Sequence, residues 1–234
     1  MFKLSRWTRP LAAPKYPAMV AEQFSHVRHW VFDLDNTLYD PAARLFDQIE
    51  VKMNDYVMRE LGVDATEANR LRGAYWRDHG TTLAGMMLHH GVEPWPYLRE
   101  VHDITLDHLD PDPVLAKAIG ALPGRRIVYT NGDGEYAARV LEQRGLSKVF
   151  DAVYGVEHAN WRPKPERAAF DLVFAAENLN PKTAAMFEDD VRNLAVPHAL
   201  GMKTVHVAPE ALPDPPEHVH HHTADLSGFL GQLK

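Results

Sequence analysis

The chain has 234 residues, a net charge of −7 and no cysteine. Its length suits one large domain or a domain that carries an insertion. The acidic balance argues against a nucleic acid polymer as a partner, because such proteins usually need a strong basic face. The lack of cysteine excludes disulfides, thiolate chemistry and zinc–cysteine sites.

The first 26 residues are expected to form a flexible leader. Basic and apolar residues there superficially resemble the start of a signal peptide, but three prolines between residues 10 and 17 interrupt any apolar core. Met19 is an alternative start to Met1. No apolar run in the chain approaches the roughly 20 residues needed to span a bilayer, so we expect no membrane partner and a cytoplasmic location.

A pair of aspartates follows the first expected strand. The apolar run 30–32 predicts a buried strand, and Asp33-Leu34-Asp35-Asn36-Thr37 comes directly after it. Strand alternation would point Asp33 and Asp35 to the same side, where like charges repel unless a cation lies between them. One carboxylate can attack a phosphorus atom while its neighbour handles protons. An Asx-rich turn is the alternative interpretation.

The next segment, residues 41–108, is expected to be an all-helical insertion. Its apolar residues recur at helical spacing, and Asp64 with Glu67 forms a capping-box arrangement at the start of one helix. The expected helices cover residues 42–61, 64–79, 83–90 and 97 to about 109. No strand candidate interrupts them.

From residue 109 onward, strands alternate with helices. The expected strands cover residues 126–130, 149–154, 184–187 and 204–207, and the expected helices cover residues 135–145, 166–177 and 192–200. This alternation predicts a parallel sheet covered on both faces. The fold class is therefore α/β, with a Rossmann-like core made of residues 27–40 and 109–234. Ligands of such sheets bind at the carboxyl ends of the strands.

Candidate phosphate-binding groups follow the second expected strand. Thr130, Asn131 and Gly132 offer a hydroxyl, an amide and a flexible backbone, although a strand-to-helix turn would use the same residues. Lys164 lies between two prolines, which place its ammonium on a stiff loop before a helix. The alternative is an ordinary surface lysine.

Three successive acids follow the strand at 184–187. Glu188, Asp189 and Asp190 repel one another unless a cation binds among them. Asp190 also fits the N-cap of the next helix, which leaves Glu188 and Asp189 for the metal. Hard oxygen ligands of this type suit Mg²⁺.

Over residues 27–230 the chain resembles the haloacid dehalogenase-like (HAD) hydrolase superfamily. The four polar segments look like its four motifs in order, and the helical insertion occupies the place of its cap domain. The resemblance implies a HAD-like core in which Asp33 is the nucleophile that becomes an aspartyl-phosphate. Asp35 would protonate the leaving oxygen and later activate water, while Thr130 and Lys164 hold the phosphoryl oxygens.

The same resemblance implies how the cofactor Mg²⁺ is bound. Asp33, the backbone carbonyl of Asp35 and Asp189 would hold the ion, with Glu188 acting directly or through water. Dehalogenases of this superfamily lack the second aspartate because a halide leaving group needs no proton. The presence of Asp35 therefore favours a phosphatase that acts on small phosphomonoesters.

Residues 40–91 resemble the pyrimidine 5′-nucleotidase branch of the superfamily. Asp-Asn-Thr-Leu-Tyr at positions 35–39 and His-Gly-Thr-Thr-Leu from position 79 carry this resemblance, which implies hydrolysis of UMP and CMP. The candidate substrate-binding residues of the insertion are Tyr75, Trp76, His79, Thr81 and Thr82. An ordinary helix end at Gly80 is the alternative.

Other functions are compatible with the same motifs. They are a broad phosphatase for small metabolites such as phosphoglycolate, a sugar phosphomutase of the same fold, and a non-catalytic regulatory or binding protein. The pattern leaves open whether the protein is a monomer or a homodimer. Four histidines between residues 218 and 222 are expected on a loop before a last helix rather than in a metal-binding tract.

Overall fold

The computed structural model describes residues 17–233, in which one sheet of six parallel strands forms the core. The strand order is β3-β2-β1-β4-β5-β6. The strands are β1 (His29–Phe32), β2 (Arg125–Tyr129), β3 (Ala152–Tyr154), β4 (Ala184–Glu188), β5 (Lys203–Val207) and β6 (His221–Thr223). Phe32 of β1 is in register with Val128 of β2 and Phe187 of β4. Because these central strands are parallel, their carboxyl ends meet at one edge of the sheet, and the expected α/β fold is confirmed.

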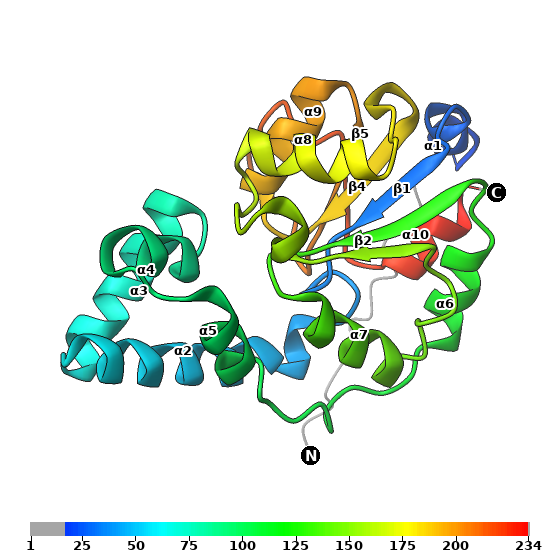
Figure 1. Cartoon of the computed structure of the whole chain (residues 1–234). Helices are drawn as coiled ribbons and strands as arrows, with labels where there is room; N and C mark the ends of the chain where they lie inside the picture. The colour runs from blue at the N-terminus through cyan, green and yellow to red at the C-terminus, as the bar shows by residue number, and fades with distance from the viewer. Residues whose placement is uncertain (1–16, 234) are drawn as a thin grey trace, which may run out of the picture.

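Helices cover both faces of this sheet (Figure 1). They are α1 (Pro17–Phe24), α6 (Pro113–Gly120), α7 (Gly134–Gln143), α8 (Arg167–Ala176), α9 (Ala195–Leu200) and α10 (Leu226–Gly231). Successive side chains of β1 point to opposite faces of the sheet. Val31 packs in the apolar cluster that contains Phe170 of α8, whereas Phe32 packs in the cluster that contains Val140 of α7. Both strand faces are therefore buried, as expected for a parallel sheet.

Five α-helices lie between β1 and β2, and the first four of them form the insertion. These four are α2 (Leu45–Leu61), α3 (Ala65–His79), α4 (Thr82–His90) and α5 (Pro94–Val101). The Asp64 and Thr81 side chains cap α3 and α4, as they accept hydrogen bonds from the amides of Glu67 and Ala84. Figure 1 shows these helices as a lobe beside the sheet. We call residues 41–108 the cap and the remainder of the described chain the core.

Short 3₁₀ helices complete the chain. They are η1 (Pro41–Ala43), η2 (Val156–Ala159), η3 (Pro181–Thr183) and η4 (Val191–Leu194). Among residues 17–233, no helix combines the length and the apolar character needed to cross a bilayer.

The connection from cap to core differs from the prediction. The expected helix to about residue 109 ends at Val101, and α6 was not predicted. Arg139 of α7 donates hydrogen bonds to the carbonyls of His102 and Ile104. These carbonyls are therefore satisfied outside a helix, which lets the chain leave α5 and run along the core.

The prediction that residues 1–26 form a flexible leader is also wrong in part. The first 16 residues, and with them the possible start at Met1, lie outside the described residues. Pro17–Phe24, however, forms α1. The Phe24 ring is only 3% exposed and packs against Trp30 and Phe229 at centroid distances of 6.2 and 5.8 Å. Helix α1 is therefore attached to the core through an aromatic anchor.

The histidine-rich segment near the C-terminus is a strand rather than a loop. His221–Thr223 forms β6, which pairs in parallel with β5 at the sheet edge. The Thr204 hydroxyl donates to the carbonyl of His218 at 2.7 Å and fixes the approach to this strand. The short strand was not predicted because its polar residues lack an apolar alternation.

The packing of α1 gives a stability prediction. Replacing Phe24→Ala should lower the free energy of unfolding by about 3–5 kcal/mol, the usual cost of removing a buried phenyl ring. Urea unfolding followed by circular dichroism measures this loss. Val51→Ala serves as the control, because Val51 is 61% exposed. A Phe24→Ala protein as stable as the parent would show that residues 17–24 do not contribute to the core.

Candidate active site

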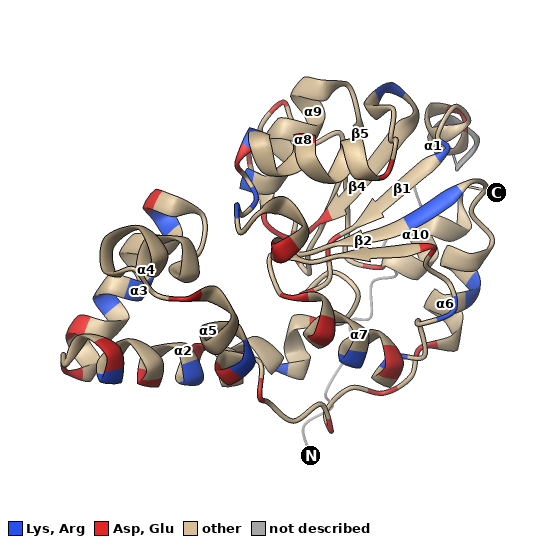
Figure 2. Ribbon diagram, in the orientation of Figure 1, with Lys and Arg blue, Asp and Glu red and all other residues tan. Residues whose placement is uncertain are grey.

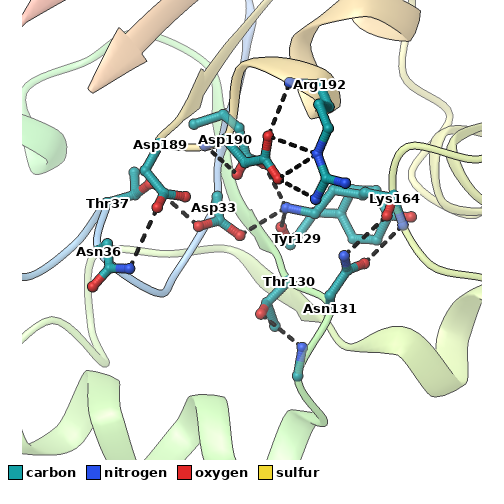
Figure 3. Close-up of polar contacts among 12 residues, drawn as sticks. Asp33, Asn36, Thr37, Tyr129, Thr130, Asn131, Lys164, Asp189, Asp190 and Arg192 are labelled. Carbon is teal, nitrogen blue, oxygen red and sulfur yellow. Dashed lines mark hydrogen bonds and ion pairs between the residues drawn. The ribbon is translucent and has the colours of Figure 1, made fainter. Parts of the chain in front are cut away.

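The predicted polar segments meet at the carboxyl edge of the sheet (Figure 3). Asp33 follows β1, Thr130 follows β2, Asp189 follows β4, and Lys164 approaches from the loop before α8. These residues and Asp35 line one cavity of about 760 Å³ between the core and the cap. Figure 2 shows acidic residues at the end of β4 and basic residues at the opposite end of the sheet, where β2 begins.

Lys164 is the centre of the polar network. Its ammonium donates to Asp33 Oδ1 at 2.7 Å, to Glu188 Oε2 at 2.6 Å and to the carbonyl of Tyr129 at 3.0 Å. All three side chains of this ion cluster are nearly inaccessible to solvent. The three ammonium protons therefore all have acceptors, which is the condition for burying such a charge.

The charges in this cluster do not balance. Burial raises the pKa of Asp33 and that of Glu188, and Lys164 offsets the effect only in part. Burial, and to a smaller extent the charge of Asp33, raises the pKa of Asp189 to about 7. Burial alone would lower the pKa of Lys164, but the Asp33 and Glu188 carboxylates raise it, so the ammonium stays charged. Without a further cation, the site therefore disfavours ionisation of its carboxyl groups.

The surplus acidity fits a divalent metal ion. Carboxylate oxygens of Asp33, Glu188 and Asp189 lie within 4.8 Å of one another. Asn36 donates to Asp189 Oδ2 at 3.4 Å, and the His206 ring contacts the Asp189 carbonyl at 3.0 Å, so this loop is held in place. An all-oxygen donor set of this kind suits a hard cation.

Asp35 has surroundings unlike those of Asp33. The hydroxyls of Tyr39 and Tyr136 both donate to its Oδ1 atom, each at 2.7 Å. Burial and the neighbouring Asp35 charge raise the pKa of both phenols, which remain neutral donors. Two rigid donors on one oxygen fix the orientation of the carboxylate beside the cavity. The two tyrosines were not identified as site residues from the sequence.

Thr130 and Asn131 of the expected phosphate-binding segment make different contacts. The Thr130 side chain is buried at the cavity, and its Oγ1 accepts a hydrogen bond from the Gly132 amide at 2.9 Å. The Asn131 amide instead bonds to the backbone of Lys164 in both directions, at 2.7 and 3.1 Å. The Asn131 side chain therefore fixes the backbone of residues 162–165, which we call the lysine loop. The expectation that Asn131 binds phosphate stays a prediction.

Asp190 is a helix cap rather than part of the carboxylate cluster. Its side chain accepts from the Arg192 amide at 3.0 Å and pairs with the Arg192 guanidinium at 2.6 Å. That guanidinium lies 3.6 Å from the centre of the Trp76 ring and donates to the Trp76 carbonyl at 3.2 Å. The loop after β4 is thereby tied to α3 of the cap through a cation–π contact.

A second contact joins the cap to the lysine loop. Gly80 has a φ of +85°, and a Cβ there would lie 2.9 Å from the carbonyl of Lys164. Only glycine fits this close approach of two backbones. The Gly80 break between α3 and α4 is therefore both a helix end and part of the cap–core interface.

Three of the five candidate substrate-binding residues of the cap line the cavity. These are Trp76, Thr81 and Thr82. Tyr75 is placed differently, because it is 8% exposed, packs against the backbone of Gly85 and bonds through its hydroxyl to His90 Nε2 at 2.6 Å. His79 turns away toward His89, with 2.9 Å between their Nε2 atoms. Tyr75 and His79 are thus not at the cavity.

Further residues of the cavity wall were not predicted. Phe46 lines it and is 37% exposed, together with the predicted Trp76, which is 47% exposed. Glu50 and Arg72 also line it and form an ion pair at 2.9 Å. The apolar spacing that placed Phe46 on a helix does not distinguish a cavity wall from a helix-packing face.

Comparison with known proteins establishes the family. Residues 27–201 match the family model described as haloacid dehalogenase-like hydrolase. The chain therefore belongs to the haloacid dehalogenase-like hydrolases, as its motifs indicated.

Individual proteins are similar to this chain in sequence or in fold. Phosphate metabolism protein 8 of Saccharomyces cerevisiae is 26% identical over 194 residues, which cover 75% of this chain and 59% of the yeast protein. A magnesium-bound Bacillus subtilis protein described as the HAD-hydrolase YfnB is 16% identical with a TM-score of 0.58, covering 88% of this chain and 98% of that chain. A 2-haloacid dehalogenase from Pseudomonas syringae is 18% identical with a TM-score of 0.56 and the same coverage. At these identities the two structures show the fold alone.

The unbalanced charge at Asp189 gives a prediction for the metal-free protein. The pKa of Asp189 rises from 3.8 to about 7 on folding. Protonation of Asp189 therefore makes its full contribution to the free energy of unfolding only below pH 3.8. This contribution is lost as the pH rises toward 7. In EDTA, Asp189→Asn should therefore gain stability relative to the parent between pH 4 and pH 8.

Magnesium should reverse this order at pH 8. We expect Mg²⁺ at a hundred times its Kd to stabilise the parent by about 2.7 kcal/mol and Asp189→Asn far less. Urea unfolding at both pH values measures these changes, with the exposed Asp214→Asn as control. Equal Mg²⁺ stabilisation of the parent and Asp189→Asn would exclude Asp189 as a metal ligand.

Proposed function

We propose that the protein is a Mg²⁺-dependent phosphatase that hydrolyses small phosphomonoesters through an aspartyl-phosphate on Asp33. Pyrimidine nucleoside 5′-monophosphates, UMP and CMP, are the proposed substrates. The observation that carries the proposal is the buried Lys164 ammonium between Asp33 and Glu188, with Asp35 beside the same cavity. This arrangement supplies a nucleophile, positive charge and a separate proton carrier.

In the first step, a carboxylate oxygen of Asp33 forms a bond to phosphorus as the bond from phosphorus to the ester oxygen breaks. Lys164 offsets charge on the phosphoryl oxygens and keeps Asp33 oriented. Asp35 gives its proton to the departing ester oxygen, so that an alcohol leaves rather than an alkoxide.

In the second step, the Asp35 carboxylate takes a proton from water. The oxygen of that water forms a bond to phosphorus, and the bond to Asp33 breaks, which releases inorganic phosphate and regenerates both carboxyl groups. Asp33, Glu188 and Asp189 would hold Mg²⁺, which offsets the negative charge of the phosphoryl group when it is bound.

The surroundings of Asp35 favour ester hydrolysis over dehalogenation. A halide leaves without a proton, whereas an ester oxygen needs one. Tyr39 and Tyr136 hold Asp35 at 2.7 Å each. A carboxylate fixed this firmly next to the nucleophile has a direct use in protonating an ester oxygen.

The cap wall supports a nucleotide as the ester. The Arg192 guanidinium covers one side of the Trp76 ring, yet nearly half of the Trp76 side chain remains exposed. Phe46 offers a second exposed ring in the same cavity. A nucleobase can stack on such surfaces, and the Glu50–Arg72 pair offers an acceptor and donors to its polar edge.

Removing the nucleophile tests the mechanism. Asp33→Asn is nearly isosteric and should lower kcat at least about a thousandfold while circular dichroism remains unchanged. Phosphate release from UMP measures the loss. Chelation with EDTA should abolish parental activity, and added Mg²⁺ should restore it. Turnover by Asp33→Asn near the parental rate would exclude the aspartyl-phosphate, and full activity in EDTA would exclude the metal.

A substrate panel with a cap variant tests the nucleotide. We expect kcat/KM of the parent to be highest for UMP and CMP among UMP, CMP, AMP, GMP, phosphoglycolate and glucose phosphates. Trp76→Ala should lower kcat/KM for UMP about fivefold to a hundredfold, the usual value of base stacking, and leave phosphoglycolate unchanged. Trp76→Phe should recover most of the loss, and Val51→Ala is the control.

The panel also separates the remaining functions. Equal turnover of many esters would indicate a broad phosphatase, and activity that requires a sugar bisphosphate would indicate a phosphomutase. No turnover of any ester in Mg²⁺ would exclude the proposed enzyme activity on this panel and favour a regulatory or binding protein.

A further inference from the structure

His102 is a buried histidine at the cavity that lies outside the four motifs. It directly follows α5, where the chain returns from the cap to the core, and is 8% exposed. Its backbone carbonyl accepts from Arg139 at 3.0 Å, which fixes it to α7 of the core. The mechanism described above gives this side chain no function.

One ring nitrogen of His102 is held by a carboxylate. Nδ1 lies 2.5 Å from Asp133 Oδ2, while Asp133 Oδ1 caps α7 by accepting from the Tyr136 amide at 2.8 Å. Burial alone would raise the pKa of Asp133, but its hydrogen bonds to His102 and to the Tyr136 amide lower it on balance. Asp133 is therefore an ionised acceptor, and Nδ1 is the donor.

The other ring nitrogen is free to bind a ligand. Within residues 17–233, Nε2 of His102 has no hydrogen-bond partner. It is not one of the side-chain atoms that are both buried and without a hydrogen-bond partner. His102 lines the same cavity as Thr130 and Gly132. Its Cε1 atom lies 3.5 Å from the position that a Cβ on Gly132 would occupy. The ring thus adjoins the loop expected to bind phosphate.

The His102 ring also adjoins the residue that orients the proton carrier. It stacks on Tyr136 with 4.3 Å between centroids and 13° between planes, and the Tyr136 hydroxyl bonds to Asp35. Asp133, His102 and Tyr136 therefore form one packed unit between the phosphate loop and Asp35. Such packing fixes a side chain within the tolerance that a substrate contact needs.

We propose that His102 is a substrate-binding residue whose Nε2–H donates a hydrogen bond to a non-bridging phosphoryl oxygen. Because Nδ1 already donates to Asp133, this contact requires a proton on both ring nitrogens, and Asp133 holds the orientation of the ring. Asp35 keeps the role of proton carrier, and no bond forms or breaks at His102. This inference rests on the proposed phosphatase function and adds a phosphate ligand contributed by the connection between cap and core.

Substitutions that mimic one ring nitrogen at a time test the contact. His102→Asn retains a donor near the Nδ1 position for Asp133 and removes Nε2, whereas His102→Gln retains a donor near Nε2. The exposed His108→Asn, on the same connection, is the control. Thermal melting establishes that each variant folds. Calorimetric titration with inorganic phosphate in Mg²⁺ and kcat/KM for UMP and phosphoglycolate are then measured.

We expect His102→Asn to bind phosphate about tenfold to a hundredfold more weakly, as for loss of a charged hydrogen bond, and to lose kcat/KM equally for both esters. His102→Gln should regain part of the loss. A folded His102→Asn with phosphate affinity and kcat/KM within twofold of the parent overturns the proposal. A loss confined to UMP also overturns it, because the contact would then be to the nucleoside.

Nitrogen NMR of the parent gives a test that does not depend on a variant folding. With ¹⁵N-labelled histidine, assigned through the ¹⁵N signals of Asp133→Asn and the variants above, the Nε2 signal of His102 should move when phosphate is added in Mg²⁺. An unmoved signal at saturating phosphate contradicts the contact. If the parent hydrolyses no ester, the phosphatase proposal fails; if it does and His102→Asn matches it, only this inference fails.

Discussion

The site depends on the burial of one ammonium group between two carboxylates. Lys164 satisfies Asp33, Glu188 and the Tyr129 carbonyl at distances of 2.6–3.0 Å, and removing it would leave two buried acids without a cation. The loop that carries it is correspondingly well held, because the Asn131 amide bonds to its backbone in both directions. The position of Asp33 is therefore set by contacts from β1, β2 and β4 together.

The cap contacts the backbone and side chains of the same loops that form this cluster. Gly80 approaches the Lys164 carbonyl, and Trp76 is covered by Arg192 three residues after Asp189. Displacement of the cap would therefore disturb the loops that hold Lys164 and the candidate metal ligands, not only the wall of the substrate cavity. The size of the cavity and the geometry of the carboxylate cluster are physically linked through these contacts.

The sequence predicts the site best where strand ends determine it. Asp33, Thr130 and Asp189 follow parallel strands in register, so a correct strand assignment is enough to bring them together. Tyr136 was missed because its bond to Asp35 joins residues 101 positions apart and carries no local pattern. The assignment of Tyr75 failed for the opposite reason. Its local pattern suggested a substrate-facing edge, but the small Gly85 on the neighbouring helix lets the ring pack inside the cap.

The two aspartates after β1 illustrate how neighbouring groups assign different chemistry to the same residue type. Asp33 is paired with the Lys164 ammonium, which offsets in part the effect of burial on the pKa of this carboxyl. The hydrogen bonds to Asp35 come from two neutral phenols, which fix its direction without placing a positive charge against it. A hydrogen bond from a neutral phenol brings no counter-charge to Asp35, whereas the Lys164 ammonium lowers the energetic cost of a negative charge on Asp33. The proposed division of roles between Asp33 and Asp35 is therefore supported by their different partners, which are Lys164 for Asp33 and the two tyrosines for Asp35.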